Sequence, residues 1–230
     1  MSNAVTNVIL KVLRDKNINP DNASLNCMVM YSGGADSLSL AKALLDATKH
    51  KIVIHHVVLR NPEARDNFQL DVLEKQLDFL RDNCREFEFI KTAFEMNLSG
   101  THTGIRDMSV AMFLAGTACR ALERNFTAIY TGHLIATPML DFLEGSAVLN
   151  ALFTNRRVKP LWLYPMRHMS NVTAKQEIYK NIGTEGLNLT VSCRKPCFRD
   201  ETYQSCLTCH ACKARARTIN ALGWDASLVK

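Results

Sequence analysis

Short apolar runs alternate with longer segments of helical periodicity over roughly the first 185 residues of the chain. The continuous, β-branched run at residues 52–58 is typical of a strand that is covered on both faces. The apolar runs predict strands or short extended segments over residues 27–31, 52–58, 87–90, 127–130 and 161–165. Apolar residues spaced three and four apart predict helices over residues 38–47, 66–83, 108–122 and 139–153, and another that begins at Thr173.

Strands that alternate with helices predict an α/β fold with a parallel sheet and helices on both of its faces. Ligands of such sheets bind at the carboxyl ends of the strands. Three polar turns follow predicted strands and should lie at that edge, at residues 32–34, 59–61 and 131–133. We therefore expect a binding site that is assembled from these turns.

Composition excludes several classes of protein. The chain has 230 residues, of which 47% are hydrophobic and 22% charged, so it can bury a core and is not disordered. No apolar run approaches the roughly 18 residues of a membrane span, and the first residues lack a secretory signal. A net charge of +6 suits an anionic ligand such as a nucleotide, but it is too small and too interspersed to require nucleic acid.

The segment Tyr31-Ser32-Gly33-Gly34-Ala35-Asp36-Ser37 follows the first predicted strand and opens a helix. Adjacent glycines allow a tight turn, and helix N-terminal amides with the hydroxyls of Ser32 and Ser37 would bind an anion. The segment lacks both the Walker lysine and the G-x-G-x-x-G spacing. Asp36 beside a phosphate predicts a bridging cation, for which we expect Mg²⁺. A plain turn with a capping Asp or Ser is the structural alternative.

This segment resembles the PP-loop of the ATP pyrophosphatase superfamily. The resemblance implies an enzyme that cleaves ATP between its α and β phosphates and adenylates a substrate. It also implies that ATP binds to Tyr31, Ser32, Gly33, Gly34, Ala35, Asp36 and Ser37. The later turn Thr131-Gly132-His133 should join the ATP site from the neighbouring strand end, with His133 at a phosphate or the acyl group unless it only makes a structural hydrogen bond.

The cysteines predict a metal site near the C-terminus. Five of the eight lie within 20 residues, at positions 193, 197, 206, 209 and 212. A tight cluster in a chain without a signal indicates a metal site in a reducing compartment, and we expect a cytoplasmic protein. Cys206, Cys209 and Cys212 form C-x₂-C-x₂-C, and the fourth ligand is Cys193 or Cys197, with His210 a weaker candidate. Four thiolates favour structural Zn²⁺, with an iron–sulfur cluster as the rival interpretation.

The two ends together resemble 7-cyano-7-deazaguanine synthase, a family of PP-loop enzymes. The resemblance implies four zinc ligands, Cys193, Cys206, Cys209 and Cys212, with Cys197 as an alternative to Cys193 or as a free thiol. It divides the chain into a PP-loop ATP-binding domain over residues 1–188 and a zinc-binding helical segment over residues 189–230, packed on that domain.

The resemblance implies an ATP-dependent ligase that converts 7-carboxy-7-deazaguanine and ammonia to the 7-cyano base, with ATP, Mg²⁺ and Zn²⁺ as cofactors. Asp36, Ser37 and Arg106 are the expected catalytic residues, with Arg106 at a carboxylate or the pyrophosphate unless it faces solvent. Residues 59–65 and 131–141 depart from the family pattern, and these segments would shape the base pocket.

That departure leaves a related enzyme open, one that stops at the amide or joins the base to another amine. A tRNA thiolation enzyme and a nucleic-acid-binding zinc module are further alternatives. The module would use six basic residues but has no accompanying aromatic stacking residues: Arg194, Lys195, Arg199, Lys213, Arg215 and Arg217. We expect the partners to be the deazaguanine base and ammonia, without nucleic acid or membrane, and a homodimer stays open.

Overall fold

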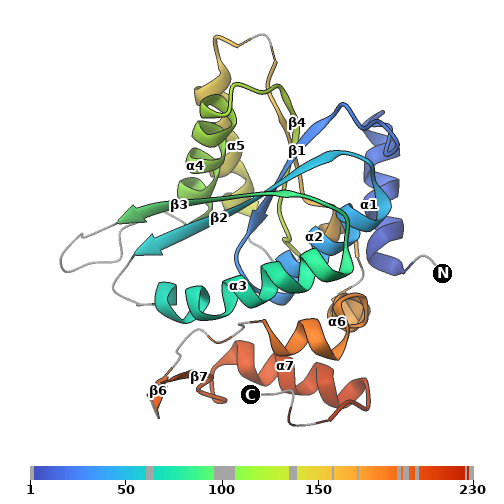
Figure 1. The fold of residues 1–230 in the computed structure, drawn as a ribbon, viewed down its shortest axis with the longest axis vertical. Coiled ribbons are helices and arrows are strands. Elements are labelled where there is room, and N and C mark those ends of the chain that lie inside the picture. The colour runs from blue at the N-terminus through green and yellow to red at the C-terminus, as the bar shows by residue number, and fades with distance from the viewer. Residues whose placement is uncertain are drawn as a thin grey trace.

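The structure is a computed structural model that describes residues 3–60, 65–95, 107–134, 139–156, 158–169, 171–190, 193, 197–199, 202–225 and 227. Five parallel strands form one sheet in the order β3-β2-β1-β4-β5 (Figure 1). The strands of the sheet are β1 (Asn26–Tyr31), β2 (Lys51–Arg60), β3 (Glu88–Glu95), β4 (Phe126–Tyr130) and β5 (Leu161–Leu163). The helices that precede or connect them are α1 (Ala4–Asp15), α2 (Ala35–Ala47), α3 (Arg65–Asn83), α4 (Asp107–Ala121) and α5 (Met139–Phe153).

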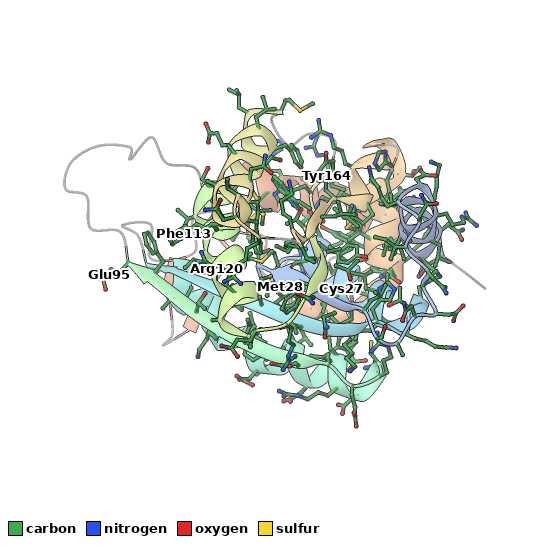
Figure 2. All side chains as sticks on the ribbon, turned by 90° about the horizontal axis from the view of Figure 1, so that it is seen from above. Cys27, Met28, Glu95, Phe113, Arg120 and Tyr164 are labelled. Carbon is green, nitrogen blue, oxygen red and sulfur yellow. The ribbon has the colours of Figure 1, made fainter. Side chains whose placement is uncertain are left out.

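The central strand β1 is buried on both faces. Cys27, Val29 and Tyr31 belong to the core under α1, α2 and α3, whereas Met28 and Met30 belong to a second core under α4 and α5 (Figures 1 and 2). This alternation requires apolar residues at successive positions, which is why the sequence shows a continuous apolar run there. The predicted fold class, a parallel sheet between two helical layers, is confirmed.

The order in which strands are added to the sheet reverses at β1. From β1 the chain moves outward to β2 and β3, and then returns to pair β4 with the other side of β1. In open parallel sheets, the crevice beyond the carboxyl ends of the two strands at such a reversal is the usual ligand site. The turns after β1 and β4 lie next to each other at this end of the sheet.

The C-terminal part packs on the same face as α2. A short 3₁₀ helix, η1 (Pro165–His168), follows β5, and α6 (Asn171–Asn188) then packs against α2. The hairpin of β6 (Cys197–Arg199) and β7 (Thr202–Gln204) precedes α7 (His210–Ala221), which packs against α6. A domain boundary after residue 188 stays a prediction. No helix in the described part of the chain is long and apolar enough to cross a membrane.

Helix α1, the 3₁₀ helix η1 and the β6–β7 hairpin lie outside the sequence-based predictions. Helix α1 buries Val5, Ile9, Val12 and Leu13, and the Asn3 side chain caps it by accepting from Thr6 N at 2.8 Å. The apolar spacing of this helix was detectable in the sequence. The β6–β7 hairpin has only three residues in each strand, which is too short to give a periodic pattern.

Candidate functional site

The turn after β1 has the backbone geometry of an anion-binding loop. Gly33 has a φ of +76°, a left-handed conformation that favours glycine. Gly34 then caps α2, so that Asp36 and Ser37 lie in the first helical turn rather than before the helix. Ser37 Oγ accepts from Ser32 N at 3.2 Å and lies 3.2 Å from Ser32 Oγ. The two predicted hydroxyls and the helix N-terminus therefore converge on one point.

The turn after β4 lies directly against this loop. A Cβ added to Gly132 would approach the carbonyl carbon of Asp36 to 3.0 Å and Ser37 N to 3.1 Å. Backbone this close leaves no room for a side chain, which explains a glycine at position 132. The neighbouring Thr131 is buried and has a structural position, because its hydroxyl accepts from Trp162 Nε1 at 2.9 Å and its N–H donates to Leu163 O.

Lysine 175 pairs with the carboxylate of the loop. Its Nζ lies 2.5 Å from Asp36 Oδ1 and 2.7 Å from Oδ2, and both side chains are partly exposed. The sequence predicts a cation at Asp36, with Mg²⁺ as the expected ion. Lys175 comes from α6, 139 residues away along the chain, and no local motif marks it. The tertiary structure therefore adds an ammonium group to the site.

Gln76 of α3 connects the loop after β1 to Leu189, which precedes the cysteines. Its side chain is fully buried, and its Oε1 accepts from Tyr31 Oη at 2.7 Å. Its Nε2 donates to Gly33 O at 2.9 Å and also to Leu189 O. Tyr31 is thus held inside the protein, where burial raises the pKa of its phenol. In the sequence, Gln76 is a polar residue within the apolar stripe of the helix predicted over residues 66–83, and this position indicated a buried polar contact.

An aromatic cluster lies beyond Gly132 at the same edge of the sheet. We use this name for His133, Phe142, Trp162 and Tyr164. The Phe142 ring centroid lies 4.5 Å from that of Tyr164, 5.3 Å from that of Trp162 and 5.5 Å from that of His133. Phe142 comes from the first half of α5, and the other members follow β4 or belong to the β5 region. The cluster therefore lies on the β4 and β5 side of the loop after β1.

Two histidines of β2 are buried within the sheet. His56 Nδ1 lies 2.8 Å from Tyr31 O, so this ring fixes the end of β1 just before the loop. His55 Nε2 lies 2.8 Å from Thr92 Oγ1 of β3. Burial, with a smaller effect from the neighbouring His56, lowers the pKa of His55 to about 4. Both rings therefore have structural positions rather than free access to a ligand.

Four cysteines form one cluster at the start of α7. The sulfur atoms of Cys193, Cys206, Cys209 and Cys212 all lie within 4.8 Å of one another. The N–H groups of Cys206 and Cys209 donate to Cys193 Sγ and Cys206 Sγ, each at 3.3 Å. Hydrogen bonds from the Thr208 hydroxyl and the Cys209 amide lower the pKa of Cys206 to about 6. Such bonds stabilise thiolates, the form that binds a metal.

Arg215 holds this cluster against the rest of the protein. Its guanidinium is buried and donates to Thr190 O at 3.1 Å, Thr190 Oγ1 at 2.9 Å and Leu187 O at 2.7 Å. Arg215 lies one helical turn after Cys212 on α7. This residue, expected above only as part of a basic surface, therefore supports the end of α6 instead.

Several predicted site residues lie outside the described part of the structure. Arg106 is one of them, as are residues 61–64, 135–138 and 194–196. Cys197 is described only as backbone in β6, so its relation to the other cysteines stays a prediction.

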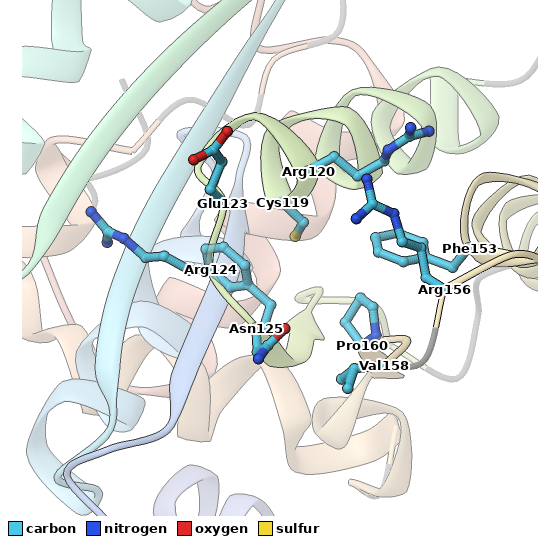
Figure 3. A pocket seen from close by; sticks show the side chains of 10 residues that line it. Cys119, Arg120, Glu123, Arg124, Asn125, Phe153, Arg156, Val158 and Pro160 are labelled. Carbon is cyan, nitrogen blue, oxygen red and sulfur yellow. The ribbon is translucent and has the colours of Figure 1, made fainter.

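A separate cavity lies at the other end of the sheet, next to the amino ends of β4 and β5. It measures about 330 Å³ and is bordered by residues that precede β4 and β5 or end α4 and α5 (Figure 3). Arg120, Arg124 and Arg156 surround it, and Arg124 pairs with Glu88 at 2.5 Å. Helix C-termini carry partial negative charge, which accounts for arginines there. The cavity is separate from the candidate site, because the loop after β1 lies at the opposite ends of the strands.

Comparison with known proteins gives a structural likeness only. No protein-family model matches the sequence, and no curated protein matches it. Among solved structures, the U34-tRNA thiolase NcsA from Methanococcus maripaludis, determined with its [4Fe-4S] cluster, matches with a TM-score of 0.52. The match has 15% sequence identity and covers 98% of this chain and 76% of that chain. At this identity the likeness concerns the fold alone: the chain shares the fold of that thiolase.

Proposed function

We propose that the protein is an ATP-dependent ligase that converts 7-carboxy-7-deazaguanine and ammonia to 7-cyano-7-deazaguanine. The observation that carries the proposal of ATP use is the phosphate loop at the reversal point of the sheet. There, the Ser32 and Ser37 hydroxyls lie 3.2 Å apart beside Gly33 and Gly34, and Gly132 lies against the same loop; these groups would form the anion site. The choice of acceptor rests on the resemblance of the two ends of the chain to the synthase family.

In the proposed reaction, a carboxylate oxygen of the base attacks the α-phosphorus of ATP and displaces pyrophosphate. Ammonia then attacks the acyl carbon of the mixed anhydride, and AMP leaves with the substrate oxygen. The amide oxygen then attacks the α-phosphorus of a second ATP and displaces a second pyrophosphate, and loss of AMP and protons from this intermediate leaves the nitrile. This chemistry needs no covalent enzyme nucleophile, so the protein must position the reactants and stabilise charge on the phosphates.

Asp36 and Lys175 supply complementary charges at the phosphates. Mg²⁺ is usually held by one or two carboxylates together with substrate phosphates, so the single Asp36 carboxylate fits it. Bound Mg²⁺ would supply positive charge there. Lys175, at 2.5 Å from Asp36, is long enough to turn its ammonium from the carboxylate to a phosphate oxygen. Ser32, Ser37 and the loop amides would hold the departing pyrophosphate.

The cysteine cluster would hold a structural Zn²⁺. A tetrahedral zinc with bonds of about 2.3 Å keeps its four sulfur atoms about 3.8 Å apart. The observed separations, within 4.8 Å with 3.4 Å between Cys209 Sγ and Cys212 Sγ, support a single ion. An iron–sulfur cluster would lie between its thiolates and hold them further apart. Four ligands leave no open position, so the metal would stabilise the C-terminal part without entering the reaction.

The test combines product mass with the number of ATP molecules used. Purified protein is incubated with 7-carboxy-7-deazaguanine, ATP, Mg²⁺ and ammonium, and AMP is measured for each base converted. Two AMP per base with the nitrile mass supports the proposal. One AMP with the amide mass identifies an enzyme that stops early, and no AMP with this substrate refutes the proposed acceptor. Asp36→Asn is the inactive control, and Arg120→Ala, at the opposite edge of the sheet, should retain full activity.

Metal content separates the proposal from its main rival. Elemental analysis should find one zinc for each chain. Iron with acid-labile sulfide would contradict a zinc site and would favour the sulfur-transfer alternative, since the structurally similar thiolase carries a [4Fe-4S] cluster.

A further inference from the structure

Arg167 has an unusual environment at the border of the candidate site. It belongs to η1, directly after β5, and its guanidinium carbon lies 4.3 Å from the Phe142 ring centroid and 6.0 Å from that of Tyr164. Contact with aromatic faces stabilises a guanidinium through cation–π attraction while its N–H edge stays available for hydrogen bonds. Arg167 is only partly buried.

No carboxylate neutralises this arginine within the described residues. Other partly buried cations of the chain have anionic or carbonyl partners: Lys42 with Asp46, Lys175 with Asp36, and Arg215 with backbone carbonyls. The Arg167 guanidinium makes no ion pair or hydrogen bond with the described part of the protein, and its contacts there are with aromatic rings. A guanidinium presents a rigid fork that matches a carboxylate in a bidentate pair.

A series of contacts connects Arg167 to the phosphate loop. Gly132 lies against the backbone of Asp36, and His133, the next residue, makes an edge-to-face contact with Phe142. Phe142 in turn lies under Arg167. The aromatic cluster thus extends from the phosphate loop to a cation at the same edge of the sheet. A planar ring that packed along the cluster would have one end near Arg167 and would lie beside the nucleotide.

We propose that Arg167 is the carboxylate-binding residue for the acceptor, which is a planar aromatic acid whose ring packs on the aromatic cluster. The identity of the acid, 7-carboxy-7-deazaguanine, rests on the proposed function. The bidentate pair orients the carboxylate so that one oxygen can approach the α-phosphorus. The same contact discriminates the acid from its amide, because an amide nitrogen would oppose guanidinium N–H donors.

The direct test is ligand binding, which needs no turnover. Trp162 lies in the cluster and reports on ligands there, and Trp224→Phe removes the other tryptophan of the chain. Fluorescence titration compares 7-carboxy-7-deazaguanine with its 7-carboxamide. The parent should prefer the acid, and Arg167→Met should weaken acid binding roughly ten- to a hundredfold with little change for the amide. Arg167→Lys should restore only part of the preference, because it keeps the charge and loses the fork.

The control is Arg156→Met. Arg156 lines the cavity next to the amino ends of β4 and β5, away from the aromatic cluster. It should leave both titrations unchanged. In steady-state assays, Arg167→Met should raise KM for the acid and leave KM for ATP within about twofold. If Arg167 only covered the Phe142 ring, Arg167→Met would change neither the preference for the acid nor the ratio of KM for the acid to KM for ATP, because methionine still covers the ring.

The outcomes separate this inference from the proposed function. Equal binding of acid and amide by the parent, or an acid preference that survives in Arg167→Met, overturns the inference even if the enzyme forms AMP. An Arg167-dependent preference without any AMP supports the inference and refutes the proposed ligase activity.

Discussion

Replacing Gln76 by Leu should both destabilise the protein and weaken ATP binding. Leu has a similar size, but it removes one acceptor and two donors from a side chain that is fully buried. Three partners then lose their hydrogen bonds: Tyr31 Oη, Gly33 O and Leu189 O. A buried polar group left without a partner costs about 1–3 kcal/mol. The lower figure for each partner gives a loss of about 3 kcal/mol in the free energy of unfolding.

For a chain of this size, 1 kcal/mol changes Tm by roughly 2–4 °C, so Gln76→Leu should lower Tm by roughly 6–12 °C. KM for ATP should rise as well, because Gly33 loses the bond that holds its left-handed turn. Gln76→Glu should be at least as harmful, since a carboxylate accepts from Tyr31 but cannot donate to two carbonyls. Thermal and urea unfolding of the metal-loaded protein measure stability, and pyrophosphate release measures KM.

Lys75→Met is the matched control, because Lys75 precedes Gln76 on the same helix and is exposed. It should change stability by less than about 0.5 kcal/mol. A Gln76→Leu variant within 1 kcal/mol of the parent, with an unchanged KM for ATP, would refute the role that the structure gives to this residue.

Three further predictions concern the loop, the metal and a buried histidine. Asp36→Asn should abolish pyrophosphate release while far-UV circular dichroism and Tm stay near those of the parent; normal release would remove Asp36 from the proposed mechanism. Cys209→Ser should lose the bound metal and make the C-terminal segment sensitive to protease, because structural zinc contributes roughly 10 kcal/mol to small sites; retained metal would contradict the four-cysteine assignment. The pKa of His55 is about 4 in the folded protein and about 6.5 in the unfolded chain. Burial of the neutral ring therefore causes no loss of the free energy of unfolding above pH 6.5, and this free energy decreases as the pH falls from 6.5 towards 4. The loss should be on the order of 3 kcal/mol. Urea unfolding at several pH values measures it, and His55→Gln should reduce the dependence of the unfolding free energy on pH between 6.5 and 4; an unchanged dependence would contradict the role given to His55.

Local features of the sequence predict the parallel sheet, the tight turn after β1 and the clustering of the cysteines. A strand buried on both faces needs an apolar run, as at Met28 to Tyr31, and a left-handed turn before a helix favours glycine, as at Gly33. Cysteine spacing limited the metal ligands to a few combinations. The cluster of Cys193 with Cys206, Cys209 and Cys212 agrees with the set that the family resemblance implied.

Gln76, Lys175 and Arg167 acquire their roles only in the folded chain. Their partners lie on elements far away in sequence: Gln76 bonds to Gly33 and Leu189, and Lys175 pairs with Asp36 across a sequence separation of 139 residues. A single glutamine, lysine or arginine on a helix has many possible environments, most of them in solvent, and local periodicity does not distinguish them. The packing of α3, α6 and η1 around the carboxyl edge selects one environment for each, because burial and charge depend on distances that only the assembled sheet defines.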